Sequence, residues 1–357
     1  MSGLDDVIAA ETTLSEVDGQ NGRLIICGHT LDELAGHKSF EAVLALLFSN
    51  LSGASEAAIR AELARARIRA FEELSHLDAG ILELSITEGL RALMARLPDG
   101  EDTDTALLLA AAPAVFVPAL IRRKAGKSSI VPSLAHSHAE DMLAMLTGTP
   151  PTPAQIAALD TYLVTVCDHG LNASTFAARV VASTRAGYTS AVLAALGALK
   201  GPLHGGAPGP VLDMLDAVGT PDRATNWLAD ELARGERLMG FGHRIYRVRD
   251  PRADALKAAL KKLGAAGGMD AERLALAEAV EREALALLRF NKPDRKLETN
   301  VEFFTALLLE ALGFPRDAFT GVFAAGRVGG WIAHAHEQID KGRLIRPQSR
   351  YIGPKAA

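Results

Sequence analysis

The chain has 357 residues, 48% of them hydrophobic and 23% charged, a balance typical of a soluble globular protein with one large domain or two. A formal net charge of −5 argues against a general nucleic-acid binder. Cys27 and Cys167 form no CxxC pair, and the acidic N-terminal segment has no apolar core, which argues against a secretory signal. The longest apolar run, residues 106–121, contains two prolines and is too short to span a bilayer. We therefore expect a cytoplasmic protein that binds neither nucleic acid nor membrane.

The first predicted element is a small β-hairpin near the N-terminus. Residues 12–17 and 23–27 have strand character, and the turn-rich residues 18–22 join them. From Ser39 onward helical periodicity takes over, and capping residues and breakers mark the helix ends. In this half of the chain helices are predicted over residues 40–48, 55–70, 87–97, 104–122, 137–146 and 153–166. The helix over 104–122 is apolar nearly all round and should be buried.

The second half of the chain continues the helical pattern. Helices are predicted over residues 173–186, 189–200, 208–218, 222–234, 251–263, 270–289, 300–312 and 325–341. A polar tail that contains Arg343, Arg346 and Arg350 follows. With helices throughout and one small hairpin, the predicted fold class is all-α.

Three histidines lie at breaks between predicted helices. His169 follows Asp168 and precedes a glycine, His204 lies in the run GPLHGGA of residues 201–207, and His243 ends the run GFGH. A histidine at such a junction more often forms a structural hydrogen bond than catalyses. Three of them on a chain with otherwise regular helices nevertheless favour a functional site.

The stretch from Met239 to Arg252 is the most unusual in the chain. Four arginines follow His243 within nine residues, and Asp250 is the only acid among them. Arginine presents a planar fork suited to carboxylates and phosphates, and histidine titrates near neutral pH. The stretch therefore predicts an anion site with an acid/base group, the alternative being a basic surface loop with a packed histidine.

A carboxylate candidate and two possible metal clusters complete the list of polar features. Glu302 lies in an apolar run at a predicted helix start, where a carboxylate is costly unless it is paired, functional or bonded to backbone donors. His334 with His336, and His136 with His138, are each two residues apart and would point to different helix faces. No metal site is therefore expected. The sequence contains no P-loop and no GxGxxG motif that follows a predicted strand, so nucleotide binding by those folds is not expected either.

Several motifs together resemble the citrate synthase family. They are GPLHGGA at 201–207, GFGH at 240–243 with DPR at 250–252, NVEF at 300–303, DHGLNASTF at 168–176 and RPQSRYIGP at 346–354. The resemblance covers nearly the whole chain, and the motifs look like those of the shorter bacterial citrate and 2-methylcitrate synthases. No single motif identifies the family, but the occurrence of all of them in this order and spacing is specific to it.

This resemblance implies a fold and an activity. It implies a mainly helical homodimer, with a large domain of residues 1–203 and 309–357 and a small mobile domain of residues 204–308. The implied reaction condenses acetyl-CoA with oxaloacetate and water to give citrate and CoA, with no cofactor. Two alternatives stay open: propionyl-CoA as the substrate, giving 2-methylcitrate, or a weakly active or non-catalytic ligand-binding relative, because Glu302 stands where most members have aspartate.

The resemblance also assigns roles to individual residues. It places His169, His243, Arg252 and Arg327 around oxaloacetate, and Arg346 in the partner subunit's site. As catalytic groups it implies Glu302 as the base, His204 as a donor to the enolate oxygen, and His243 as the group that polarises and protonates the ketone. The residues implied for CoA binding are Leu238, Gly240, Gly242, Arg247 and Asn300.

Overall fold

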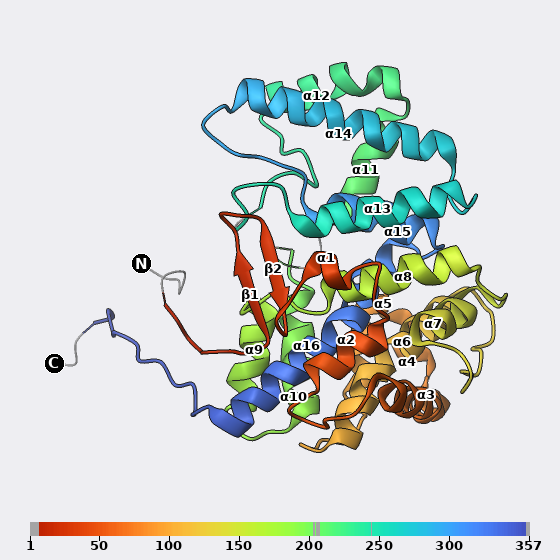
Figure 1. Ribbon diagram of the computed structural model, residues 1–357, viewed down its shortest axis with the longest axis vertical. Coiled ribbons are helices and arrows are strands. Elements are labelled where there is room, and N and C mark those ends of the chain that lie inside the picture. Colours follow the sequence, from red (N-terminus) through yellow and green to blue (C-terminus); the bar gives the residue numbers. More distant parts are fainter. Residues whose placement is uncertain (1–6, 203, 205–207, 244, 355–357) are drawn as a thin grey trace.

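The computed structural model describes residues 7–202, 204, 208–243 and 245–354. These residues form 16 α-helices, three short 3-10 helices and a single three-stranded sheet (Figure 1). The predicted all-α fold class is confirmed. The 3-10 helices are η1 (Glu73–His76), η2 (Pro221–Arg223) and η3 (Arg316–Ala318).

The predicted N-terminal hairpin is present, with one further strand. Strands β1 (Ser15–Asp18) and β2 (Arg23–Ile26) pair antiparallel, and β2 also pairs with β3 (His29–Thr30). Cys27 and Gly28, at φ +48° and +84°, turn the chain into β3. The sequence did not reveal β3, because a two-residue strand has no periodicity.

The first group of helices follows the hairpin. They are α1 (Leu31–Leu34), α2 (Phe40–Leu47), α3 (Glu56–Glu72), α4 (Ala79–Glu83), α5 (Ile86–Met94), α6 (Thr103–Lys124), α7 (His138–Thr147) and α8 (Pro153–Val166). The side chains of Ser39, Ser55, Ser137 and Thr152 each accept a backbone N–H in the first turn of the helix that they precede. Local capping thus explains why these starts were predictable, whereas the one-turn helices α1 and α4 were missed.

The core of this part is built around α6 and the last helix, α16 (Phe319–Lys341). Residues 105–120 of α6 are all buried, and α6 packs against α3, α7 and α16. By length and composition α6 could cross a membrane, yet 83% of its apolar window is buried inside the fold, as in the core helix of a soluble protein. Helix α16 begins six residues before the predicted start at residue 325. Gly321 in its first turn had weakened the helical pattern.

The remaining helices are α9 (Ala173–Ala182), α10 (Tyr188–Leu199), α11 (Pro208–Val218), α12 (Ala224–Ala233), α13 (Pro251–Ala265), α14 (Ala271–Asn291) and α15 (Val301–Ala311). The prediction that α9 continues to residue 186 is wrong. The hydroxyls of Ser183 and Thr184 donate to the carbonyls of Val180 and Val181, and Arg185 adopts φ +64°. These contacts end the helix.

Helices α11 to α14 gather at one end of the molecule, the upper end in Figure 1, and α13 faces α8 across the middle. This group corresponds to the predicted small domain of residues 204–308, although the division into a large and a mobile domain stays a prediction. After α16 the described tail, up to Pro354, has no helix or strand and leads away from the body (Figure 1).

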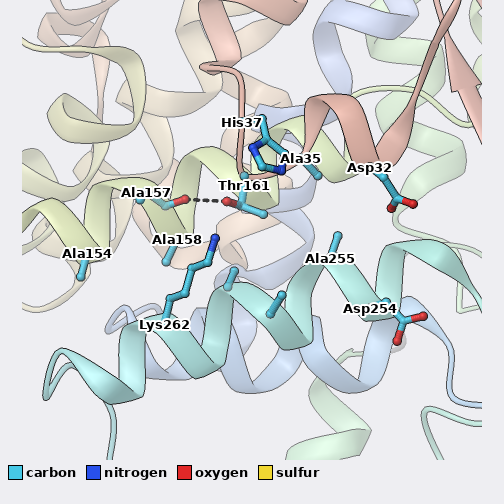
Figure 2. A pocket seen from close by; sticks show the side chains of 13 residues that line it. Asp32, Ala35, His37, Ala154, Ala157, Ala158, Thr161, Asp254, Ala255 and Lys262 are labelled. Carbon is cyan, nitrogen blue, oxygen red and sulfur yellow. Dashed lines mark hydrogen bonds between the residues drawn. The ribbon is translucent and has the colours of Figure 1, made fainter.

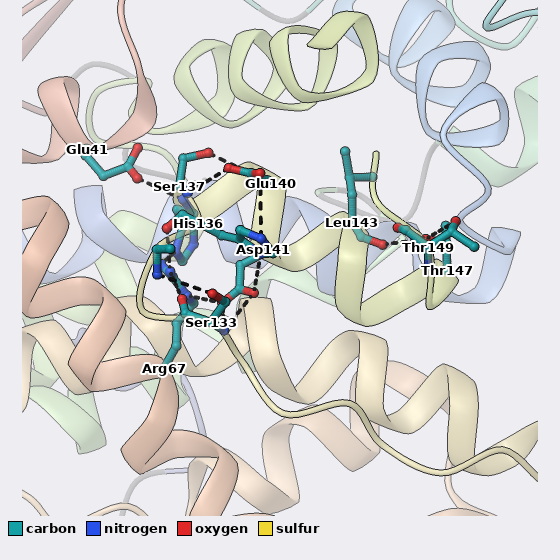
Figure 3. Close-up of polar contacts among 12 residues, drawn as sticks. Glu41, Arg67, Ser133, His136, Ser137, Glu140, Asp141, Leu143, Thr147 and Thr149 are labelled. Atoms are coloured by element: carbon teal, nitrogen blue, oxygen red, sulfur yellow. Dashed lines mark hydrogen bonds and ion pairs between the residues drawn. The ribbon is translucent and has the colours of Figure 1, made fainter. Parts of the chain in front are cut away.

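A buried polar cluster joins α3 to α7 (Figure 3). The Arg67 Nε donates to Asp141 Oδ2 at 2.7 Å, and Nη2 donates to the carbonyl of His136 at 2.9 Å. Both charged side chains are almost fully buried. Nearby, the backbone N–H of His138 donates to Glu41 Oε1 at 2.8 Å, which extends the cluster to α2. The cluster therefore ties three helices together through charges withdrawn from water.

Replacing Arg67 with methionine should lower the free energy of unfolding by about 3–5 kcal/mol, because Asp141 would stay buried without its cation. The matched control is Arg69→Met in the same helix, since its ion pair with Asp104 is exposed and should contribute less than about 1 kcal/mol. Urea unfolding of the two variants measures the difference. Equal losses would show that the buried cluster adds no stability beyond a surface ion pair.

Candidate active site

The His243 segment is held by two glycines and an antiparallel bridge. Gly240 and Gly242 adopt φ +85° and +86°. A Cβ on Gly240 would lie 2.9 Å from Phe303 Cβ, so no larger residue fits there without movement. Phe241 forms an isolated bridge with Thr299, which lies just before α15. The two motifs GFGH and NVEF, about 60 residues apart, are thus neighbours.

Asn300 connects this segment to the start of α15. Its backbone N–H donates to the Gly240 carbonyl at 2.9 Å, and its Nδ2 donates to the Gly242 carbonyl at 2.8 Å. Its Oδ1 accepts the N–H of Glu302 at 3.0 Å and so caps the helix. Both ends of the Asn300 carboxamide are occupied within the protein. A contact of Asn300 with CoA stays a prediction.

Asp250 and Arg252 form a buried ion pair at the start of α13. Asp250 Oδ1 accepts the backbone N–H and the Nε of Arg252, both at 3.0 Å, and Oδ2 accepts Nη2 at 2.9 Å. Oδ2 also accepts the N–H of Val301 at 3.2 Å, which links the pair to α15. Burial opposes the charge on Arg252, but Asp250 outweighs it, so the pKa of the guanidinium lies above its ordinary value.

His243 presents an N–H toward the same place as Arg252. Its Nδ1 accepts the backbone N–H groups of Ile245 and Tyr246 at 3.0 and 3.1 Å. Burial and the neighbouring Arg252 lower the pKa of His243 to about 4, so the ring is neutral at pH 7 and its proton lies on Nε2. Arg252 Nη2 is 3.1 Å from that Nε2. Two donors therefore lie side by side, and a ligand oxygen within hydrogen-bond distance of both nitrogen atoms would satisfy them.

His169 completes the cluster through Tyr246. The His169 Nε2 lies 3.1 Å from the Tyr246 hydroxyl, and the ring centroids of His169 and His243 are 5.8 Å apart. Burial, followed by the charges of Arg252 and Arg327, holds the pKa of His169 well below its ordinary value. The predicted residues His169, His243 and Arg252 are therefore brought together. Tyr246, which the sequence analysis did not select, connects them.

Arg327 is a buried cation of α16. Its Nε donates to the Val166 carbonyl, and its guanidinium stacks on the Phe323 ring at 4.8 Å. Burial lowers its pKa to about 10. Within the described part of the chain no carboxylate forms an ion pair with Arg327, so its charge is available to an anion.

His204 is positioned by Ser174 and Trp331. Its Nε2 lies 2.8 Å from Ser174 Oγ, which also accepts the Trp331 Nε1 hydrogen at 3.1 Å. Burial, and then Arg327, lowers the pKa of His204 to about 4, so its ring is neutral too. The sequence analysis missed Trp331 because it lies 157 residues from Ser174. The other predicted loop residues Leu203, Gly205, Gly206 and Ala207 lie outside the described residues.

The half-buried Glu302 carboxylate stands apart from the hydrogen-bond networks. This carboxylate forms no hydrogen bond or ion pair with the described residues. The alternative explanation, that the Glu302 side chain binds backbone donors at the helix start, does not hold, because Asn300 caps α15. Burial raises the pKa of Glu302 to about 7, against the opposing effect of Arg252. A free carboxyl group with a pKa near neutrality is suited to general acid–base chemistry.

Three of the residues predicted to bind a ligand do not belong to this buried cluster. Arg346 is exposed on the C-terminal tail and does not enter this site within the same chain. Arg247 has an exposed side chain, whereas Leu238 is buried in the core, at 6% exposure. Their assignments to oxaloacetate and CoA stay predictions.

No three-residue cluster suited to a metal occurs among the described side chains. His334 bonds Asp168 at 3.2 Å and Arg179 at 2.8 Å, whereas His336 bonds the Tyr188 hydroxyl at 2.8 Å. The two histidines thus face different neighbours and do not form a shared site.

A separate cleft of about 310 Å³ lies between α8, α13 and residues 32–37 (Figure 2). Six alanines of α8 and α13 line it together with charged and polar side chains that include Lys262 and His37. Neither His243 nor Arg252 lines this cleft, although α13 carries both Asp254 of the cleft and Arg252 of the buried cluster.

Comparison with known proteins places this arrangement in context. The family described as "Citrate synthase, C-terminal domain" matches residues 3–348. The chain is 38% identical over 379 residues to the citrate synthase of Haloferax volcanii, covering 99% of this chain and 96% of that protein. The crystal structure of citrate synthase from Thermotoga maritima has a TM-score of 0.85 at 33% identity, and covers 99% of this chain and 96% of its own.

A third similar protein was solved as a ternary complex with two ligands. Citrate synthase from Thermoplasma acidophilum, solved with carboxymethyl coenzyme A and oxaloacetate, has a TM-score of 0.86 at 28% identity, again covering 99% and 96% of the two chains. All these matches extend over nearly the whole chain.

The raised pKa of Glu302 predicts a pH-dependent stability. Because the carboxyl pKa rises from 4.5 to about 7 on folding, its ionisation opposes folding fully above pH 7, and this cost disappears as the pH falls toward 4.5. Glu302→Gln should therefore raise the free energy of unfolding at pH 8 by roughly 3 kcal/mol, at about 1.4 kcal/mol per pKa unit, and by much less at pH 5.

Denaturant unfolding at the two pH values tests this expectation. The control is Glu310→Gln, also in α15, whose carboxylate is paired with Arg273 and should give no such gain. A gain for Glu302→Gln that is the same at both pH values would mean that ionisation of Glu302 is not its cause.

Proposed function

Since the chain belongs to the citrate synthase family and is accordingly an acyltransferase, we propose that its buried histidine–arginine cluster condenses acetyl-CoA with oxaloacetate and water to give citrate and CoA. One observation carries this proposal. His243 Nε2–H and Arg252 Nη2 are two donors 3.1 Å apart that share no acceptor among the described residues, and Arg327 has no carboxylate partner among the same residues. A dicarboxylate with a ketone oxygen supplies the acceptors that this cluster lacks.

Oxaloacetate would bind through charge and hydrogen bonds. Arg252 and Arg327 would each hold a carboxylate, and His169 and His243 would add neutral donors. The rigid pairing of Arg252 with Asp250 means that one donor is already oriented before the ligand arrives. The Thermoplasma relative was solved with oxaloacetate and a CoA derivative, which supports these two ligand classes.

The thioester needs a base and an oxyanion donor together. Glu302 would remove a methyl proton from acetyl-CoA, and the neutral His204 would donate a hydrogen bond to the enolate oxygen that forms. The carbanion carbon would then attack the ketone of oxaloacetate, whose oxygen takes a proton from His243. Water finally cleaves the thioester and releases the CoA thiol.

His204 can serve as this donor because Ser174 can orient its ring. Ser174 Oγ accepts the Trp331 hydrogen and lies 2.8 Å from both Asn172 Oδ1 and His204 Nε2, so its single hydrogen can be donated to either of them. When it is donated to His204, the remaining proton of the neutral ring would lie on Nδ1 and be available to the substrate. The pKa of about 4 supports a neutral ring near pH 7.

The CoA and subunit contacts belong to the same proposal. The exposed Arg247 and the loop from Leu238 to Gly242 would contact CoA beside the catalytic groups. The C-terminal tail would bring Arg346 into the site of a second subunit in a homodimer. Tyr351 and Ile352, at 76% and 87% exposure, are apolar groups on this tail that such a contact would cover. A cytoplasmic location is consistent with these substrates.

The direct test supplies acetyl-CoA and oxaloacetate together and follows free thiol. The protein should release thiol only when both are present, and His243→Ala should abolish the activity because the ketone then lacks its proton donor. Oxaloacetate binding measured by calorimetry separates lost binding from lost chemistry. Absence of thiol from the wild-type protein at every pH from 6 to 9 would refute the assignment.

Glu302→Asp tests whether the site is built around the longer acid. Removing one methylene withdraws the carboxylate by roughly 1 Å, and a shift of this size can lower kcat by about 100-fold. We expect such a fall, because the carboxylate position is set by the capped start of α15. A rise in turnover would instead favour the alternative of a weakly active relative with a displaced base.

Relative rates with acetyl-CoA and propionyl-CoA decide the acyl substrate. A pocket discriminates one methylene by about 1–3 kcal/mol, so the preferred thioester should have the higher kcat/KM by roughly 10- to 200-fold. We expect acetyl-CoA to be preferred. The reverse order would make the protein a 2-methylcitrate synthase.

A further inference from the structure

We propose that the β1–β2 hairpin is a positioning element for the active site, with Gly19 at its tip as the decisive residue. The hairpin contacts the His169 segment at its base and the segment that follows His243 at its tip. The inference rests on the proposed function for its catalytic consequence, but its structural part can be tested without activity. Figure 1 shows the hairpin extending from the body toward the group of α11 to α14.

The base of the hairpin is bonded to the residue after His169. The Gly170 N–H donates to Ser15 Oγ at 3.0 Å. Gly170 has φ +59°, and a Cβ there would lie 3.2 Å from Val17 Cγ2, so strand β1 lies directly against this turn. The position of β1 therefore constrains the backbone that presents His169.

The hairpin itself is held firmly. Strands β1 and β2 are paired over four positions, and Leu24 and Ile26 of β2 are buried in the core. At the tip Asp18 Oδ1 accepts the N–H groups of Gln20 and Asn21 at 3.1 and 3.0 Å, which closes the turn. These contacts fix the position of the tip relative to the base of the hairpin.

The tip contacts the backbone that follows His243. The Arg247 N–H donates to the Gly19 carbonyl at 2.8 Å. A Cβ on Gly19 would lie 2.4 Å from the Ile245 carbonyl oxygen and 2.8 Å from its carbon, so any side chain would collide with backbone atoms. On the other side of the turn, a Cβ on Gly22 would lie 2.8 Å from Val248 Cγ2. Residues 245–248 therefore lie against both glycines.

These contacts bear on catalysis through the His243 ring. The N–H groups of Ile245 and Tyr246, which lie between His243 and Arg247, both donate to His243 Nδ1 and so direct its proton to Nε2. The Tyr246 hydroxyl in turn meets His169. A side chain introduced at position 19 would displace residues 245–247. This displacement would change the orientation of His243 and its separation from His169. A shift of about 1 Å at reacting groups can cost about 100-fold in rate.

The first experiment compares Gly19→Ala with Gln20→Ala. Gln20 is exposed in the same turn and contributes only a backbone N–H, which alanine retains. Gly19→Ala should lower kcat roughly 10- to 100-fold and displace the pH profile, because the Nδ1 contacts of His243 are altered. Gln20→Ala should keep kcat within twofold. A folded Gly19→Ala protein with wild-type kcat and pH profile would overturn the proposal.

Hydrogen exchange provides a readout that does not depend on turnover. Amides of residues 245–249 should exchange faster in Gly19→Ala than in the wild type, whereas those of α6 should not change. Equal exchange of residues 245–249 in the two proteins contradicts the proposed contact. If the wild-type protein releases no thiol, the proposed function fails, but this exchange comparison still decides whether the hairpin holds the segment.

The base of the hairpin supplies a second pair of variants if Gly19→Ala does not fold. Ser15→Ala removes the acceptor of the Gly170 N–H, whereas Ser15→Thr retains a hydroxyl. Ser15→Ala should raise the KM for oxaloacetate several-fold through His169, and Ser15→Thr should restore it. The proposal is wrong if both variants keep the wild-type KM, or if threonine gives no rescue.

Discussion

The buried ion pair between Asp250 and Arg252 is the interaction on which the rest of the site depends. Two charges removed from water are stable only when further hydrogen bonds satisfy them. Here Asp250 accepts four such bonds, three from Arg252 and one from the N–H of Val301. The pair therefore joins α13 to the start of α15, which carries Glu302. It also orients the guanidinium so that Arg252 Nη2 lies beside His243 Nε2.

Burial, together with the charges around this pair, sets the protonation of its neighbours. Arg252 and Arg327 add positive potential to a site already removed from water, and His169, His204 and His243 consequently stay neutral near pH 7. Neutral rings can each present a single N–H to a ligand oxygen. Glu302 experiences the opposite balance, because the desolvation of its carboxylate outweighs the attraction of the two arginines. One environment thus supplies both neutral donors and a base that titrates near neutrality.

The helical scaffold brings these groups together from distant parts of the chain. His169 lies in the turn between α8 and α9, Arg327 lies within α16, and His243 precedes α13. The loops that carry His169 and His243 are also held by contacts of their backbone N–H groups with the N-terminal hairpin. The N-terminal hairpin, a minor part of the fold by size, contacts two of these loops. Its tight packing against residues 245–248 shows how an element without catalytic side chains can still determine the geometry of the site.

The sequence by itself determined most of the helices, because their caps, breakers and periodicity are local. Ser39, Ser55, Ser137 and Thr152 marked starts that the structure confirms. Motif order also sufficed to predict the family, and the glycines around His243 pointed to a site. Elements without a local signal, such as β3 and the first turn of α16, escaped the prediction. Only the tertiary structure decided which polar groups face one another. The contact between Ser174 and Trp331, the free carboxylate of Glu302 and the docking of Gly19 arise from long-range packing, and no local pattern records it.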